Sequence, residues 1–128
     1  MGTPDAMTIR WRTNVPTDSR VWLGPAPDAL VPMFSDATLT TEHELRVTGL
    51  SPKARSYYAV GTSAEILSGG DTLTWFDTAP HPDSTTSTRV WVLGDSGLPG
   101  APQDRVRDAY YAFPGAQGTN VWLMRCEA

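Results

Sequence analysis

Apolar and polar positions alternate in short runs along the first two thirds of the chain. In residues 7–13, Met7, Ile9 and Trp11 fall on one face and polar residues on the other, which is the period of a half-buried strand. The same pattern predicts further strands at residues 20–24, 42–50, 56–61 and 73–78, and a weaker one near 30–34. Turn residues such as those at 14–18 separate the runs. The pattern predicts an antiparallel β-sandwich or barrel.

The pattern changes after residue 88. Residues 90–93 form a continuous apolar run, which is typical of a strand covered on both faces, as in a parallel sheet. A helix is predicted next, with one apolar face made of Val106, Ala109, Tyr110 and Phe113. Residues 120–124 then predict a second buried strand. Strand, helix and strand make one βαβ unit, whose own core is too small for independent stability.

Composition limits the classes of function. Hydrophobic residues make up 40% of the chain and charged residues 19%, which is typical of a globular protein. The formal charge is −4, with acids and bases interspersed, so we expect no nucleic-acid partner. We expect no membrane partner either, because no apolar run reaches the roughly 18 residues of a spanning helix. The single cysteine, Cys126, excludes an internal disulfide.

The candidate chemistry lies in residues 94–97, Gly-Asp-Ser-Gly, directly after the strand predicted at 90–93. The glycine spacing does not match a dinucleotide-binding loop, and no lysine follows as a phosphate-binding loop requires. Ser96 as a nucleophile would need a histidine base nearby. The chain offers only His43, on a predicted strand, and His81, in a polar stretch.

Asp95 is the strongest candidate residue. Ligands in open α/β sheets gather outside the carboxyl ends of the strands, and a carboxylate there suits a metal ion in a hydrolase. The alternative is that Asp95 only caps the turn or the following helix.

Two other sets of residues have a structural and a functional interpretation. His43 is either a partly buried strand histidine beside Glu42 and Glu44, which we favour, or a metal ligand. The five tryptophans either fill cores, which we favour, or stack on carbohydrate: Trp11, Trp22, Trp75, Trp91 and Trp122.

Leu50-Ser51-Pro52 followed by Tyr57 resembles the corner at which fibronectin type III-like domains enter their next-to-last strand. In sandwiches of this kind the tyrosine hydroxyl bonds back to the backbone. The resemblance implies a fibronectin type III-like β-sandwich over residues 1–80, with its first strand clipped because little precedes Met7. A linker is expected at 81–88. Residues 89–128 are expected to be an incomplete βαβ unit.

The ordered set of these segments resembles the purple acid phosphatases, which are metallophosphoesterases with such a sandwich at the N-terminus. The segments that carry the likeness are 41–45, 50–52, 57–61, 76–80 and 89–97. The likeness covers nearly the whole chain. It implies a mainly β chain in which a β-sandwich is followed by a truncated βαβ unit of an α/β metallophosphoesterase domain.

The resemblance also implies an activity. Members of the family are hydrolases of phosphate monoesters, and a metal-bound hydroxide is their nucleophile. By this likeness Asp95 is the first ligand of a two-metal centre of iron and a second divalent metal, and the partner is a phosphate ester. An extracellular or periplasmic location is implied, although the N-terminal residues do not form a signal peptide.

The sequence departs from the family after residue 124. The family's Gly-Asp-Asn-x-x-Tyr motif is expected there, but residues 125–128 read Arg-Cys-Glu-Ala, and the Gly-Asn-His-Glu and later histidine motifs are absent from the 128 residues. Neither Cys126 nor Glu127 is expected to replace them. We therefore expect an acid phosphatase fragment without a catalytic residue of its own, inactive alone. The alternative is a non-catalytic sandwich that serves as a binding or spacer module.

Overall fold

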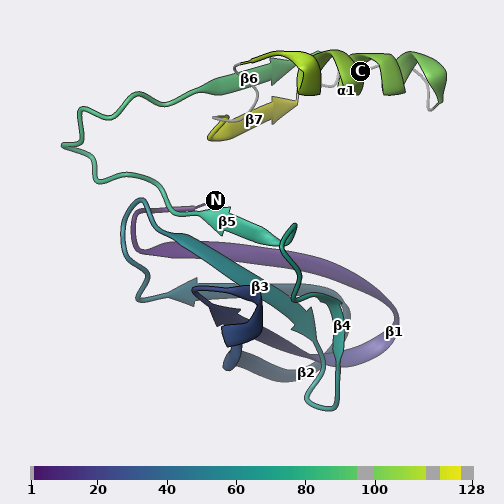
Figure 1. Ribbon diagram of the computed structural model, residues 1–128. Helices are drawn as coiled ribbons and strands as arrows, with labels where there is room; N and C mark the ends of the chain where they lie inside the picture. Colours follow the sequence, from purple (N-terminus) through teal and green to yellow (C-terminus); the bar gives the residue numbers. More distant parts are fainter. Residues whose placement is uncertain (1, 95–99, 115–118, 125–128) are drawn as a thin grey trace. The chain divides into compact units, whose positions relative to one another are not determined.

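The computed structural model (Figure 1) describes residues 2–94, 100–114 and 119–124. These residues are mainly β, and the larger sheet is antiparallel, which confirms the prediction of a mainly β chain with antiparallel strands. The chain divides into two compact units, Met1–Ser84 and Thr85–Ala128, and each is described by itself. No helix in the described residues is long and apolar enough to cross a membrane.

The first unit is a single sheet with strand order β2-β1-β3-β4, in which β5 pairs with the other end of β3. Its elements are β1 (Ala6–Gly24), the 3-10 helix η1 (Pro27–Ala29), β2 (Val31–Thr48), β3 (Arg55–Gly61), β4 (Ile66–Gly69) and β5 (Trp75–Asp77). All pairings within it are antiparallel. Strand β4 was not predicted from the sequence.

The turn predicted at residues 14–18 was wrong, because β1 runs through it. Four residues of β1 lie between Arg12 and Thr17, whereas only Thr41 of β2 lies between their partners Glu42 and Thr40. The turn-forming residues are thus accommodated as an irregular bulge, which bends a strand instead of ending it. The runs predicted near 30–34 and at 42–50 also belong to one continuous strand, β2, which ends at Thr48.

The core of the first unit depends on this bend. Ile9 and Val21 lie on the same strand, and a straight strand would separate them by about 40 Å. Both nevertheless belong to one buried cluster, with Val47 of β2 and Val60 of β3. The two halves of β1 therefore fold toward each other, and Figure 1 shows the long β1 ribbon curving back. Partly buried residues complete the core: Met7, Trp11, Phe34, Leu45, Leu50, Tyr58 and Phe76.

Thr78 closes the first unit directly after β5. Its hydroxyl donates to the Ser51 carbonyl at 2.6 Å and accepts from the Ala54 amide at 2.9 Å. Its own amide donates to the Ala54 carbonyl at 3.1 Å. The side chain is buried, so these bonds are shielded from water. Thr78 therefore ties the loop between β2 and β3 to the end of the sheet.

The second unit has the predicted order of strand, helix and strand: β6 (Val90–Leu93), α1 (Ala101–Ala112) and β7 (Val121–Met124). Strands β6 and β7 are parallel and in register from Val90↔Val121 to Leu93↔Met124. In Figure 1, α1 runs in roughly the same line as the two strands, and most of it extends beyond the arrowheads of β6 and β7.

The described residues of the second unit include no fully buried side chain. Phe113, predicted on the packed face of the helix, instead follows the last helical residue and is 63% exposed. Core packing was also the wrong interpretation for Trp122, which is 58% exposed, and for Trp75 in the first unit, at 40%. Little apolar area is removed from water in the second unit, so its stability is expected to be low.

Truncating Val21 to alanine should lower the free energy of unfolding of the first unit by roughly 2–3 kcal/mol, because the side chain is fully buried and leaves a cavity. Urea unfolding followed by circular dichroism measures the change. The matched control is Val31→Ala on β2, which is 53% exposed and should cost less than about 0.5 kcal/mol. Equal losses for the two variants would contradict the assigned core.

Hydrogen exchange should be slow in β1, β2 and β3 and faster in β6, α1 and β7. The reason is that amides next to buried apolar contacts open only with the whole unit, whereas the second unit has no buried residue among those described. Exchange detected by NMR or mass spectrometry tests this. Protection at Val90–Leu93 equal to that at Val21 and Val47 would contradict it.

Candidate functional site

The first candidate site lies at the carboxyl end of the parallel strand pair. Because β6 and β7 run in the same direction, Leu93 and Met124 end side by side at one edge, which is where ligands gather in α/β sheets. Asp95 and Ser96 follow β6 in the chain, and Cys126 and Glu127 follow β7. These four residues lie outside the described part of the structure.

The two strands are held in register at their amino ends. The Arg89 carbonyl accepts hydrogen bonds from the amides of Asn120 and Val121, at 3.0 and 3.2 Å. The Asn120 side chain returns one bond, because its Oδ1 accepts from the Arg89 amide at 2.9 Å. Asn120 thus fixes where pairing begins, and through it which residues end together at the opposite edge.

An aromatic-lined cavity of about 290 Å³ lies between α1 and the strand pair. Trp91 of β6 stacks on Tyr110 of α1 with ring centroids 3.8 Å apart, and Trp122 of β7 meets both rings edge-on at 4.8 and 5.6 Å. Tyr110 donates its hydroxyl proton to Thr119 at 2.7 Å, which holds the ring in place. Leu93 also lines the cavity, so it reaches the carboxyl end of β6.

The first turns of α1 form the polar rim of this cavity. Gly100 precedes the helix with φ of +114°, a backbone conformation that favours glycine. Arg107 pairs with Asp104 at 3.0 Å and with Asp108 at 2.9 Å. The hydrogen bond and charge of Asp108, with the charge of Asp104, raise the pKa of the Arg107 guanidinium. Gln103 and Asp104 line the cavity beside it.

The second candidate site is a buried polar cluster around His43 in the first unit. His43 is 2% exposed, and its ring stacks on Trp11 at 4.7 Å, nearly parallel. Its Nε2 lies 2.9 Å from Thr13 Oγ1, and its Nδ1 lies 2.8 Å from Ser19 Oγ. Both ring nitrogens are therefore occupied.

The hydrogen bonds define which nitrogen of His43 carries the proton. Thr13 donates its single hydroxyl proton to the Val15 carbonyl at 2.8 Å. Thr13 must therefore accept from His43, which places the proton on Nε2. In the neutral ring Nδ1 is then the acceptor, and Ser19 donates to it. With both nitrogens engaged by hydroxyls, His43 has the structural role that we favoured from the sequence.

The neighbours of His43 on β2 point to the other face of the sheet and form a ladder of ion pairs. Arg10 pairs with Glu44, and Arg12 pairs with Glu42. The hydrogen bond from Arg12 lowers the pKa of the Glu42 carboxyl, and Glu42 in turn raises the pKa of Arg12. A shallow hollow of about 590 Å³ lies over this ladder. Because the four side chains are largely exposed, the pairs contribute little stability.

Sequence reasoning did not find two members of the His43 cluster, Thr13 and Ser19. Thr13 shares the alternating face of Trp11, which was a usable signal. Ser19 lies beyond the bulge in β1, where the alternation is interrupted, so no sequence pattern linked it to His43. His81 is exposed, and its Nδ1 lies 3.4 Å from the Asp83 carboxylate. Ser96, for which His81 was considered as a base, lies outside the described residues.

Within the described residues, no group of three or more His, Cys, Asp or Glu side chains converges in a way that could hold a metal ion. No family model, no curated protein and no solved structure matches the chain.

Replacing Ser19 with alanine should destabilise the first unit by about 1–3 kcal/mol, because His43 Nδ1 would be left buried without a donor. Chemical unfolding gives the value. Ser68→Ala, at an exposed position of β4, is the control and should change stability by less than about 0.5 kcal/mol. If Ser19→Ala were as mild as the control, the hydrogen bond to His43 would not be the stabilising contact.

Proposed function

We propose that this chain is the N-terminal part of a purple acid phosphatase-like hydrolase of phosphate monoesters, with Asp95 as its first metal ligand. One observation carries the proposal most: β6 and β7 are parallel and end together at Leu93 and Met124. Gly94-Asp95 follows one of these ends directly. A carboxylate that follows the carboxyl end of a parallel strand is well placed to bind a ligand or metal.

As part of this proposal, the first unit is a fibronectin type III-like domain, and three features support that assignment. Its sheet is antiparallel and folds on itself around a core that both halves of β1 share. Leu50, from the segment that resembles the family's corner, packs on that core. Tyr57, from the same segment, lies on β3 opposite Trp75 of β5.

The described residues do not fit the two-metal centre that the family implies, because they bring no three metal-binding side chains together. Asp95 would supply one ligand and could not hold two metals alone. We therefore propose no reaction step for these 128 residues by themselves. Their proposed contribution is the strand that presents Asp95 and the sheet unit that precedes it, in a protein that the resemblance assigns to an extracellular or periplasmic location.

The alternative function is a non-catalytic binding or spacer module. It is favoured by one observation: among the described residues, every buried side chain belongs to the first unit. A unit with its own core can serve as a folded module without the second unit.

Reading the gene beyond codon 128 in all three frames separates the two proposals. The hydrolase proposal expects Gly-Asp-Asn-x-x-Tyr close to codon 124 in one frame, followed by Gly-Asn-His-Glu. A protein made with that segment should bind metal and hydrolyse p-nitrophenyl phosphate, whereas residues 1–128 alone should not. Asp95→Asn should then reduce turnover by at least about 100-fold, because it removes a metal ligand.

Asp28→Asn, in η1 of the first unit, is the matched control and should leave turnover unchanged. Absence of both motifs from every frame would overturn the hydrolase proposal and favour the binding or spacer module. Full turnover by the Asp95→Asn protein would overturn the role given to Asp95.

A further inference from the structure

We infer that the cavity between α1 and the strand pair binds a purine base of the adenine type. This inference concerns residues other than Asp95, and it does not rest on the proposed hydrolase function. It starts from the side chains that line the cavity: Trp91, Tyr110, Tyr111 and Trp122 from three different elements, with Gln103 at the rim.

The lining of the cavity favours a flat aromatic ligand. Aromatic side chains bind nucleic-acid bases by stacking, and such stacking needs ring surface that the protein leaves open. Trp122 is 58% exposed and Tyr111 is 66% exposed, so much of their ring surface is open. Trp91 and Tyr110 stack on each other, so the two rings together form one wall of the cavity. The opposite face of the strand pair is aliphatic and offers no such walls: Val90, Val92, Val121 and Leu123.

The size of the cavity limits the ligand. At about 290 Å³ it lies just below the roughly 300–1,000 Å³ typical of pockets for drug-sized molecules. A single two-ring base is the kind of ligand that such a volume accommodates, whereas a dinucleotide is too large.

The polar groups of the rim favour a neutral base with a donor beside an acceptor. Arg107 is paired with both Asp104 and Asp108, so its charge is already compensated and does not require an anionic ligand. The Gln103 side chain makes no hydrogen bond to any other described residue. Its carboxamide has a donor and an acceptor side by side. This pair matches the N6 amine and N7 of adenine.

Titration of the 128-residue chain with adenosine, followed by NMR of the tryptophan indole N–H groups, tests the inference. Each indole signal is assigned from a Trp→Phe variant. We expect saturable shifts of Trp91 and Trp122, with a Kd on the order of 1 mM for a single stacked base. The indole signals of the first unit should not move: Trp11, Trp22 and Trp75.

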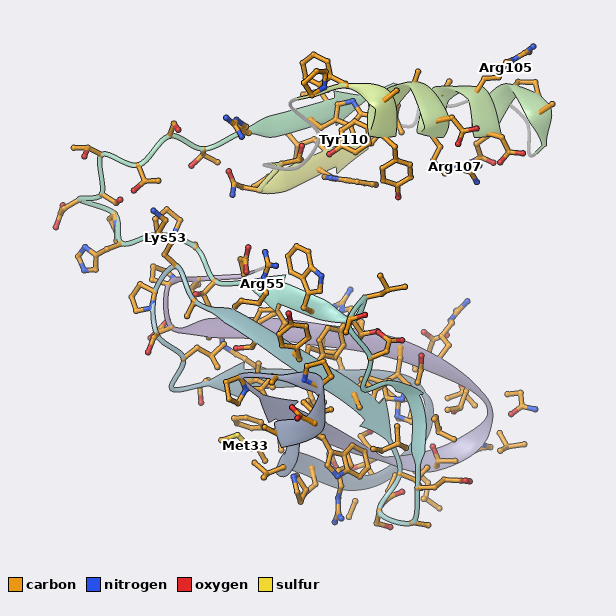
Figure 2. All side chains as sticks on the ribbon, in the orientation of Figure 1. Met33, Lys53, Arg55, Arg105, Arg107 and Tyr110 are labelled. Atoms are coloured by element: carbon orange, nitrogen blue, oxygen red, sulfur yellow. The ribbon has the colours of Figure 1, made fainter. Side chains whose placement is uncertain are left out.

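Gln103→Ala should weaken adenosine binding by at least about fivefold, because it removes the paired hydrogen bonds to the base. Alanine is a strong helix former, so the variant should keep α1 folded. Arg105→Ala is the matched control, since Arg105 projects from the opposite side of the same helix to Arg107 (Figure 2) and should leave binding unchanged. Absence of saturable shifts at Trp91 and Trp122 would overturn the inference. Equal binding by the Gln103→Ala protein would also overturn it.

Discussion

The fold of the first unit depends on one constraint: Ile9 and Val21, on one continuous strand, must meet in one core. A regular strand cannot satisfy this, since it would carry the two side chains far apart. The irregular pairing between Arg12 and Thr17, followed by a second irregularity before Ser19, supplies the bend. The same bend brings Thr13 and Ser19 to opposite nitrogens of His43. The buried apolar contacts and the buried polar cluster therefore have a common geometric origin.

The second unit is held together differently. In the described residues its helix and strands meet through the rings of Trp91, Tyr110 and Trp122 and not through buried aliphatic side chains. Aromatic pairs contribute specific geometry as well as area, so a few rings define how α1 lies on the strands. Because these aromatic rings leave part of their surface open, the space between α1 and the strands is a cavity and not a closed core. This cavity reaches Leu93, the last residue of β6.

The sequence predicted much of this arrangement. Alternation identified most of β1, β2 and β3, and the apolar runs identified β6 and β7, because their patterns reflect one or two covered faces. The sequence pattern could not predict that residues 14–18 would continue a strand. Their turn propensity is a local property, whereas the pairing with β2 that overrides it involves residues distant in the sequence. Strand β4 is only four residues long and has exposed apolar side chains, so it carries no alternation. Of the candidate residues, His43 could be assigned a structural role, but its hydroxyl partners depended on the bulge.

The bonds of Thr78 have a mechanical consequence. Beyond Thr78 the Ala79 carbonyl still accepts a hydrogen bond from the Lys53 amide at 3.2 Å, and β5, which precedes Thr78, pairs with β3 over only three residues. Tension along the departing segment would therefore load the Thr78 hydroxyl and amide bonds before it reaches the β5–β3 ladder. Thr78 therefore anchors the C-terminal end of the sheet. It would give the first unit resistance to being peeled open from its C-terminal end that the short ladder alone does not supply.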